Sequence, residues 1–184
     1  MRSRKKKTIT LVLGGARSGK SRYAQTLASR RKKVTYIATA RPRDPEMRRK
    51  IARHRRQRPS HWKTAEVSRN LGKTIQEEGP KADVLIIDCL TTFLANAANT
   101  RNGNAAQLPA LAEEVCEAIR ATKASVIAIS NEVGSGVVPG YRSGRVYRDL
   151  LGQMNQQLAA IADRVVLMVA GIPLTVKGPG GKKS

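Results

Sequence analysis

The stretch that most constrains this chain lies near its N-terminus and reads GGARSGKS. It fits the pattern G-x-x-x-x-G-K-[ST] of phosphate-binding loops in nucleotide-binding proteins. Residues 8–13 before it are rich in β-branched and apolar side chains and predict a strand, and residues 21–28 after it predict the start of a helix. The loop consists of Gly14, Gly15, Ala16, Arg17, Ser18, Gly19, Lys20 and Ser21.

The residue types of this loop suit a nucleoside triphosphate. Glycines let the backbone curl so that its N–H groups face phosphate oxygens, and the helix N-terminus adds partial positive charge. Lys20 is expected to reach the β- and γ-phosphates, and the Ser21 hydroxyl to ligate Mg²⁺. The alternative is a glycine-rich turn that contains GKS by chance, and the flanking strand and helix argue against it.

Strand-like and helix-like segments alternate along the chain. Strands are predicted at residues 34–39, 84–88, 125–130 and 165–170, the last being the final strand, and helices at 44–56, 67–78, about 108–119 and 143–163. Residues 99–104 are predicted to form a polar loop. The pattern predicts an α/β, P-loop NTPase-like fold of three layers with a mainly parallel central sheet. We expect one nucleotide-binding catalytic domain at 8–177, a basic disordered tail at 1–7 and a flexible tail at 178–184.

The charge of the chain is high and unevenly distributed. Its formal net charge is +22, and residues 1–82 carry 25 Lys and Arg against 5 Asp and Glu. A polyanionic small ligand, nucleic acid or a cationic surface that serves solubility would each fit this charge. Aromatic residues make up only 3% of the chain, with one Phe and one Trp, which argues against base stacking on a nucleic acid.

Cysteine use and hydropathy indicate the compartment. Cys89 and Cys116 are the two cysteines and form no C-x-x-C motif, so we interpret both as buried free thiols in a reducing compartment. The longest apolar run, residues 165–174, is too short to span a bilayer, and no signal peptide is recognisable. We therefore expect a cytoplasmic protein without a transmembrane segment.

The helix predicted at 44–56 carries a histidine among cations. Asp44 suits the N-cap and Pro45 the first helical position. Met47, Ile51 and His54 share one face that should point toward the protein body, while most other positions are Arg or Lys.

Surrounding positive charge should lower the pKa of His54 and keep its imidazole neutral, and a neutral imidazole is a nucleophile. An ordinary packed histidine with a structural hydrogen bond is the alternative, and periodicity alone favours that alternative. His61, just past the helix, is expected in a packed loop.

Two carboxylates follow predicted parallel strands. Asp88 ends the apolar run at 84–88 and should lie beside the phosphate loop, where it would orient Mg²⁺ or cap the next helix. Glu132 lies in a glycine-rich loop after the strand at 125–130. It is a candidate base or metal-shell carboxylate, and a loop carboxylate paired with an arginine is the alternative.

Several stretches together resemble the bifunctional adenosylcobinamide kinase/adenosylcobinamide-phosphate guanylyltransferase family. The likeness covers roughly residues 8–177, and as a set these stretches are specific although the phosphate loop alone is not. They are GGARSGKSRYA at Gly14, YIATA at Tyr36, DPEMRRKIARHRRQRPSHWKTAE at Asp44, IDCLTTFLAN at Ile87, SNEVGSGVVP at Ser130 and RVYRDLLGQMNQQLAAIAD at Arg145.

The resemblance implies two reactions with ATP and GTP as substrates. The γ-phosphoryl group of ATP or GTP passes to the hydroxyl of adenosylcobinamide, and GTP then guanylylates a histidine that passes GMP to the cobinamide phosphate. That histidine lies four residues before R-P in the family and corresponds to His54 here. Glu66 and Asp88 are expected to bind nucleotide together with the phosphate loop. The resemblance also implies a homo-oligomer, with a trimer as the assembly.

Two departures from the family leave room for altered substrate handling. Gly140 and Tyr141 stand where the family usually has Glu-Asn after the proline, and the N-terminal basic tail is additional. We expect small-molecule substrates and no specific nucleic-acid partner. A nucleic-acid-binding P-loop ATPase, and a small-molecule P-loop kinase whose histidine is purely structural, remain the alternatives.

Overall fold

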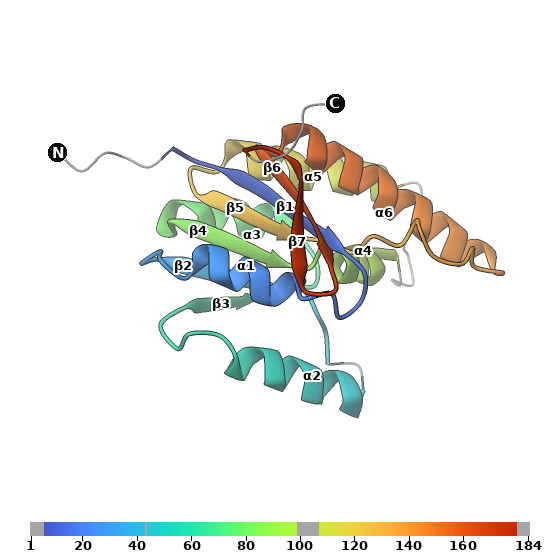
Figure 1. The fold of residues 1–184 in the computed structure, drawn as a ribbon, viewed down its shortest axis with the longest axis horizontal. Helices are drawn as coiled ribbons and strands as arrows, with labels where there is room; N and C mark the ends of the chain where they lie inside the picture. The colour runs from blue at the N-terminus through green and yellow to red at the C-terminus, as the bar shows by residue number, and fades with distance from the viewer. Residues whose placement is uncertain (1–5, 43, 99–106, 180–184) are drawn as a thin grey trace.

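A mainly parallel sheet forms the middle layer of the molecule (Figure 1). The computed structural model describes residues 6–42, 44–98 and 107–179, and within these ranges the sheet has seven strands in the order β3-β2-β4-β5-β1-β6-β7. All neighbouring strands run parallel except β6 and β7, which form an antiparallel pair. The predicted α/β, mainly parallel architecture is therefore confirmed.

The elements alternate as the sequence predicts. The strands are β1 (Ile9–Gly14), β2 (Val34–Ala38), β3 (Lys63–Glu66), β4 (Val84–Asp88), β5 (Ser125–Ile129), β6 (Arg164–Val169) and β7 (Ile172–Lys177). The helices are α1 (Lys20–Ala28), α2 (Pro45–Arg56), α3 (Leu71–Glu78), α4 (Leu90–Ala98), α5 (Leu108–Ala121) and α6 (Arg142–Ile161), with a 3-10 turn η1 (Gly79–Lys81) after α3.

Each face of the sheet has its own apolar core. On one face α3, α5 and α6 cover side chains of the central strands, among them Leu11, Leu85 and Val126. On the other face α1 packs through Ala24 and Ala28 on the same strands. Aliphatic side chains make up most of both clusters, as the shortage of aromatic residues requires.

The helix predicted at residues 67–78 begins later than predicted, and a strand that the sequence did not reveal precedes it. Residues 63–66 form strand β3, which pairs with β2 from Thr35–Lys63 to Ala38–Glu66, and α3 begins only at Leu71. Asn70 precedes α3 with a φ of 56°, a left-handed conformation that ends any continuous helix through this segment. The sequence KTAE has no apolar alternation, so hydrophobic patterning could not reveal this edge strand.

The strand predicted at residues 165–170 is present as β6, but the prediction that it is the last strand is wrong. β7 follows β6 through a two-residue turn at Ala170 and Gly171, with Val169 paired to Ile172. Both turn residues have positive φ, 49° and 86°, as a type I′ hairpin turn requires. Gly171 and Pro173 look like strand breakers in sequence, yet here the glycine makes the turn and the proline lies on the edge strand, where it is tolerated.

The ends of the chain are described only in part. Lys7, placed in a tail by the sequence, donates hydrogen bonds from Nζ to the carbonyl oxygens of Ile119 (2.9 Å) and Arg120 (2.6 Å) near the end of α5. The polar loop predicted at 99–104 lies outside the described residues, as do most of both predicted tails. No helix in the described part of the chain is long and apolar enough to cross a membrane.

Candidate active site

The phosphate loop connects β1 to α1, as the sequence predicts. Gly14 has a φ of 145°, and a Cβ there would lie 2.6 Å from the Met168 carbonyl oxygen and 2.7 Å from Ser18 Oγ. Gly19 has a φ of 94° and immediately precedes α1. Both positions therefore require glycine, because an added side chain would be strained or would clash. The Gly171 amide also donates to the Ser18 carbonyl oxygen (3.1 Å), so the β6–β7 turn supports the loop.

The N-terminus of α1 has features that favour binding of an anion. No side chain caps this end of the helix, and its first turn contains no acidic residue. The positive end of the helix dipole therefore faces the phosphate loop without a competing carboxylate in its own first turn. Lys20 is buried, and its Nζ donates to the Gly15 carbonyl oxygen (2.5 Å) and to Ser18 Oγ (3.4 Å), within the loop.

The predicted carboxylates lie along one edge of the sheet. Asp88 ends β4 and Glu66 ends β3, and each is paired in register with Ala38 at the end of β2. Glu132 follows β5, and its amide donates to the Gly14 carbonyl oxygen (3.2 Å). The carboxyl ends of β3, β2, β4, β5 and β1 thus bring all three predicted carboxylates and the phosphate loop to the same edge.

The three carboxylates are not equally close to the phosphate loop. Four strand steps of about 4.8 Å separate β3 from β1, which places Glu66 roughly 19 Å along the edge from the loop's strand. Asp88 lies two steps from β1, and α1 packs against both β4 and β5. Glu66 therefore lies at the β3 end of this edge, next to β2, after which the chain continues into α2. Asp88 lies nearer to the phosphate loop.

Asp88 has a side-chain partner that the sequence did not reveal. The Tyr36 hydroxyl on β2 donates a hydrogen bond to Asp88 Oδ2. Burial first, and then the negative charge of Asp88, raise the pKa of Tyr36, so the phenol remains a hydrogen-bond donor. Within the described chain Asp88 Oδ1 accepts no side-chain or backbone hydrogen bond, which leaves that oxygen available to a ligand.

Glu132 makes a local contact instead of an ion pair. Its Oε1 accepts a hydrogen bond from the Gly134 amide (2.7 Å). Among the described residues no arginine forms an ion pair with it. The half-buried side chain stays next to the phosphate loop, since its backbone is bonded to Gly14.

Helix α2 has the predicted start and the predicted end. Asp44 Oδ1 accepts a hydrogen bond from the Met47 amide (2.7 Å), Pro45 takes the first helical position, and the helix ends at Arg56. Met47, Ile51 and His54 are half-buried and form the less exposed face, as predicted. The helix lies beyond β3, apart from the other helices (Figure 1), so this face turns toward the body without entering either apolar core.

The segment after α2 is anchored by a tryptophan and an arginine. Trp62 is buried in the core that contains Tyr36, and the Arg58 guanidinium lies 3.6 Å from the centroid of the Tyr36 ring. His61 is exposed and meets Trp62 edge-on, with ring centroids 6.5 Å apart. The loop is therefore packed through Arg58 and Trp62, whereas the imidazole of His61 is exposed to solvent.

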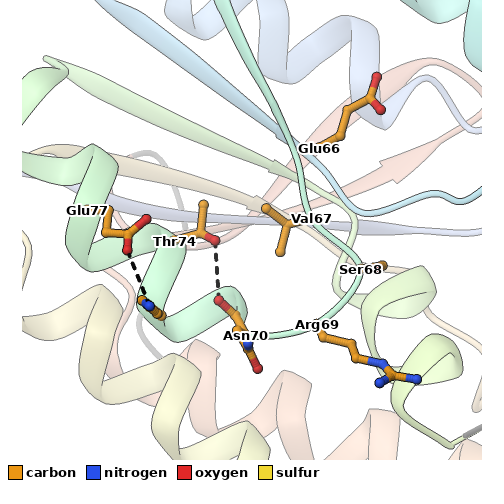
Figure 2. A pocket seen from close by; sticks show the side chains of 8 residues that line it. Glu66, Val67, Ser68, Arg69, Asn70, Thr74 and Glu77 are labelled. Carbon is orange, nitrogen blue, oxygen red and sulfur yellow. Dashed lines mark hydrogen bonds and ion pairs between the residues drawn. The ribbon is translucent and has the colours of Figure 1, made fainter.

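A surface pocket of about 350 Å³ opens between the end of β3 and the start of α3 (Figure 2). Its lining is polar and includes Glu66, Asn70 and Thr74, and Arg69 reaches away from α3. Among the described residues no group of three or more His, Cys, Asp and Glu side chains could hold a metal by itself.

Comparison with known protein families decides the assignment. Residues 10–176 match the model of the CobU family, described as cobinamide kinase / cobinamide phosphate guanyltransferase. The chain belongs to this family. The activity class that the sequence resemblance implied, a kinase and guanylyltransferase acting on cobinamide, is that of the CobU family.

Relatives cover the CobU-family chain almost end to end. It is 40% identical to the bifunctional adenosylcobalamin biosynthesis protein CobU of Salmonella typhimurium, over 92% of this chain and 99% of that protein. It is 39% identical to the Escherichia coli protein of the same name, with the same coverage. It is 41% identical to CobP of Pseudomonas aeruginosa, over 91% of this chain and 96% of that protein.

Solved structures that are distant in sequence share the fold. A Pyrococcus horikoshii protein matches with a TM-score of 0.55 at 9% identity, over 94% of this chain and 87% of that one. An ATPase of a bacterial type III secretion system matches with a TM-score of 0.52 at 12% identity, over 91% and 56%. At these identities the likeness concerns the fold alone.

Proposed function

We propose that this protein phosphorylates adenosylcobinamide with ATP or GTP and then transfers GMP from GTP to the product through His54. The observation that carries the proposal is a formed phosphate loop in a chain about 40% identical, over nearly its whole length, to bifunctional CobU proteins. The product of the two steps would be adenosylcobinamide-GDP.

The kinase step requires positioning and charge neutralisation. The first-turn N–H groups of α1 and the Lys20 ammonium would hold the triphosphate, and this charge would stabilise the γ-phosphoryl group as it passes to the substrate hydroxyl. Glu132, whose backbone is bonded to Gly14 of the loop, would accept the proton of that hydroxyl. No covalent enzyme intermediate is needed for this step.

The oxygen atoms at the site fit Mg²⁺. A hydroxyl from Ser21 and a carboxylate oxygen from Asp88 are the hard ligands that this ion prefers, and two protein ligands suffice because Mg²⁺ keeps water and nucleotide phosphates as its others. The open Asp88 Oδ1 supports this assignment. When bound, the ion would neutralise charge on the phosphates.

The guanylyl step requires a nucleophile, and His54 is the candidate. An imidazole nitrogen would attack the α-phosphorus of GTP, forming a P–N bond as the bond to the leaving pyrophosphate breaks. A phosphate oxygen of cobinamide phosphate would then attack the same phosphorus, and the P–N bond breaks to restore the imidazole. The arginines of α2 surround this position with positive charge, which would hold the phosphates.

Glu66 is proposed to bind the guanosine end of the nucleotide. A carboxylate accepts hydrogen bonds, and its negative charge would oppose phosphate binding. Its position far along the edge from the phosphate loop, beside the surface pocket, supports contact with the base or ribose.

Labelling with α-³²P GTP tests the histidine. Wild-type protein with Mg²⁺ should acquire an acid-labile, base-stable label, as a phosphoramidate does. His54→Ala and His54→Asn should lose the label and the guanylyltransferase activity while the kinase step survives at least in part, because only the second step uses the imidazole.

His61→Ala is the matched control, since His61 is exposed and lies outside the helix. It should keep the label. Label lost with His61→Ala and kept with His54→Ala would transfer the role to His61, and label kept in both variants would remove histidine from the mechanism.

We further propose that the protein is a homo-oligomer, with a trimer as the expected assembly. Four apolar side chains, Val169 at the end of β6 and Ile172, Leu174 and Val176 on β7, are between 53% and 69% exposed and are here called the β7 strip. Large exposed apolar patches on an edge strand mark sites of association. The strip contains no charged side chain, so two copies of this strongly cationic chain would meet there with the least repulsion.

A further inference from the structure

A buried tyrosine contacts the carboxylate at the phosphate-binding end of the sheet. Tyr36 is fully buried, and its hydroxyl donates to Asp88 Oδ2. Tyr36 is paired in register with Ile86, two residues before Asp88, so the tyrosine and the carboxylate lie on the same face of the sheet. This is the face that α1 covers, and α1 carries Lys20 and Ser21 in its first turn.

The tyrosine ring has little freedom to move. It packs in a core cluster with Val34, Trp62 and Ile86, and the Arg58 guanidinium lies on its face, 3.6 Å from the ring centroid. Close packing on one side and a cation on the ring hold the hydroxyl at a fixed point. A buried phenol of this kind needs a hydrogen-bond acceptor, and Asp88 provides it.

A fixed donor determines the orientation of the carboxylate. With Oδ2 held by Tyr36, rotation of the Asp88 side chain costs a charge-assisted hydrogen bond, and Oδ1 is the oxygen left for a ligand. We propose that Tyr36 is a positioning residue that orients Asp88 for the metal–nucleotide complex in both reactions. This inference rests on the metal role proposed for Asp88. Groups that orient a metal ligand in this way typically contribute about 10–100-fold to metal affinity.

The substitution Tyr36→Phe tests this role, because it removes the hydroxyl and keeps the ring against Arg58 and the core. Mn²⁺ binding to the complex with β,γ-imido-GTP, measured by electron paramagnetic resonance without turnover, should weaken about tenfold. The Mg²⁺ concentration for half-maximal kinase and guanylyltransferase rates should rise by a similar factor. Binding of the nucleotide without metal should change little.

Tyr147→Phe is the matched control. It also removes a tyrosine hydroxyl, from a half-buried side chain, but that hydroxyl donates to the Thr91 carbonyl oxygen (2.9 Å) and not to a carboxylate. A similar change in the Mn²⁺ affinity of both variants would mean that general loss of packing, and not Asp88, is responsible, and would overturn the proposal.

Asp88→Asn, alone and combined with Tyr36→Phe, distinguishes the metal role of Asp88 from the positioning role of Tyr36. Unchanged Mn²⁺ affinity in Asp88→Asn would overturn the metal role of Asp88 and, with it, that part of the proposed function. Weaker Mn²⁺ binding in Asp88→Asn with no effect of Tyr36→Phe would overturn only the positioning role. If Tyr36 acts through Asp88, Tyr36→Phe should add nothing in the Asp88→Asn background, and additive effects would contradict it.

A second measurement needs no substitution at Tyr36. Wild-type protein labelled with 3-fluorotyrosine should give a ¹⁹F resonance for Tyr36, assigned by difference from Tyr23→Phe, Tyr141→Phe and Tyr147→Phe. Mg²⁺ added to the nucleotide complex should shift this resonance, since Asp88 would then share its charge with the ion. An unshifted resonance would overturn the proposal even if Tyr36→Phe failed to fold.

Discussion

At the scale of single residues, Lys20 is the side chain on which both reactions should depend. It is buried in the loop, with its ammonium bonded to Gly15 and close to Ser18, where triphosphate oxygens would bind. Lys20→Ala should reduce both kcat values roughly 100-fold or more, because each step develops negative charge that this cation neutralises. Steady-state kinetics and calorimetric GTP binding would measure the effect.

Lys32→Ala provides the comparison for Lys20→Ala. Lys32 is exposed beyond the C-terminal end of α1, so its removal lowers the net charge equally without touching the loop. It should leave both activities near wild type. Near wild-type phosphorylation of cobinamide by Lys20→Ala would contradict the assignment of the phosphate loop.

Residues with local sequence signals were predictable, and residues with distant partners were not. Gly14 to Ser21 form a contiguous motif, and Asp88 directly ends an apolar run, so both could be placed from the chain alone. Tyr36 lies inside a buried strand, and its partner Asp88 is 52 residues away on the next strand of the sheet. Its one available signal was that a tyrosine within a buried parallel strand must find an acceptor for its hydroxyl.

At the scale of elements, the two strands missing from the sequence prediction are both at the edges of the sheet. Central strands are buried on both faces and appear as continuous apolar runs, which is why β1, β2, β4 and β5 could be predicted. β3 pairs on one side only, and β7 is exposed at most of its positions, so neither requires such a run. Their pairing depends on neighbours that local patterning does not include.

The β6–β7 hairpin is the element whose surface can be tested for association. Replacing Ile172 and Leu174 of the β7 strip with lysine places two charges on the surface proposed to be covered by another copy. The wild-type protein should elute as a multiple of the 20.0 kDa chain in size-exclusion chromatography with light scattering, and the double variant as a monomer. Burying two unpaired charges in an interface would cost more than the apolar contact contributes.

Gln153→Lys on the exposed face of α6 controls for added charge and should keep the wild-type mass. A wild-type monomer would contradict the proposed oligomer. An oligomer that survives Ile172→Lys with Leu174→Lys would place the interface on another surface.

At the scale of the whole molecule, the excess of positive charge is not explained by the phosphates of one nucleotide. The net charge is +22, and the exposed positions of α2 are mainly arginines. Such a surface attracts any polyanion through the release of counterions, without sequence recognition. CobU-family membership assigns the phosphate loop to cobinamide chemistry, so binding of nucleic acid should be an electrostatic side effect of this surface.

Salt dependence distinguishes a side effect from a function. Raising salt from about 50 to about 200 mM should weaken binding of a fluorescent DNA oligonucleotide roughly 1,000-fold or more, if six or more phosphates are contacted. Binding of GTP with Mg²⁺ should change far less, because backbone N–H groups and a metal hold its phosphates in a fixed site. Arg48→Gln with Arg49→Gln should reduce the salt slope by about 0.9 per lost contact and leave GTP binding intact. Fluorescence anisotropy and calorimetry on the same protein measure both. Tight, salt-resistant DNA or RNA binding that GTP displaces would instead make nucleic acid a ligand of the phosphate-loop site.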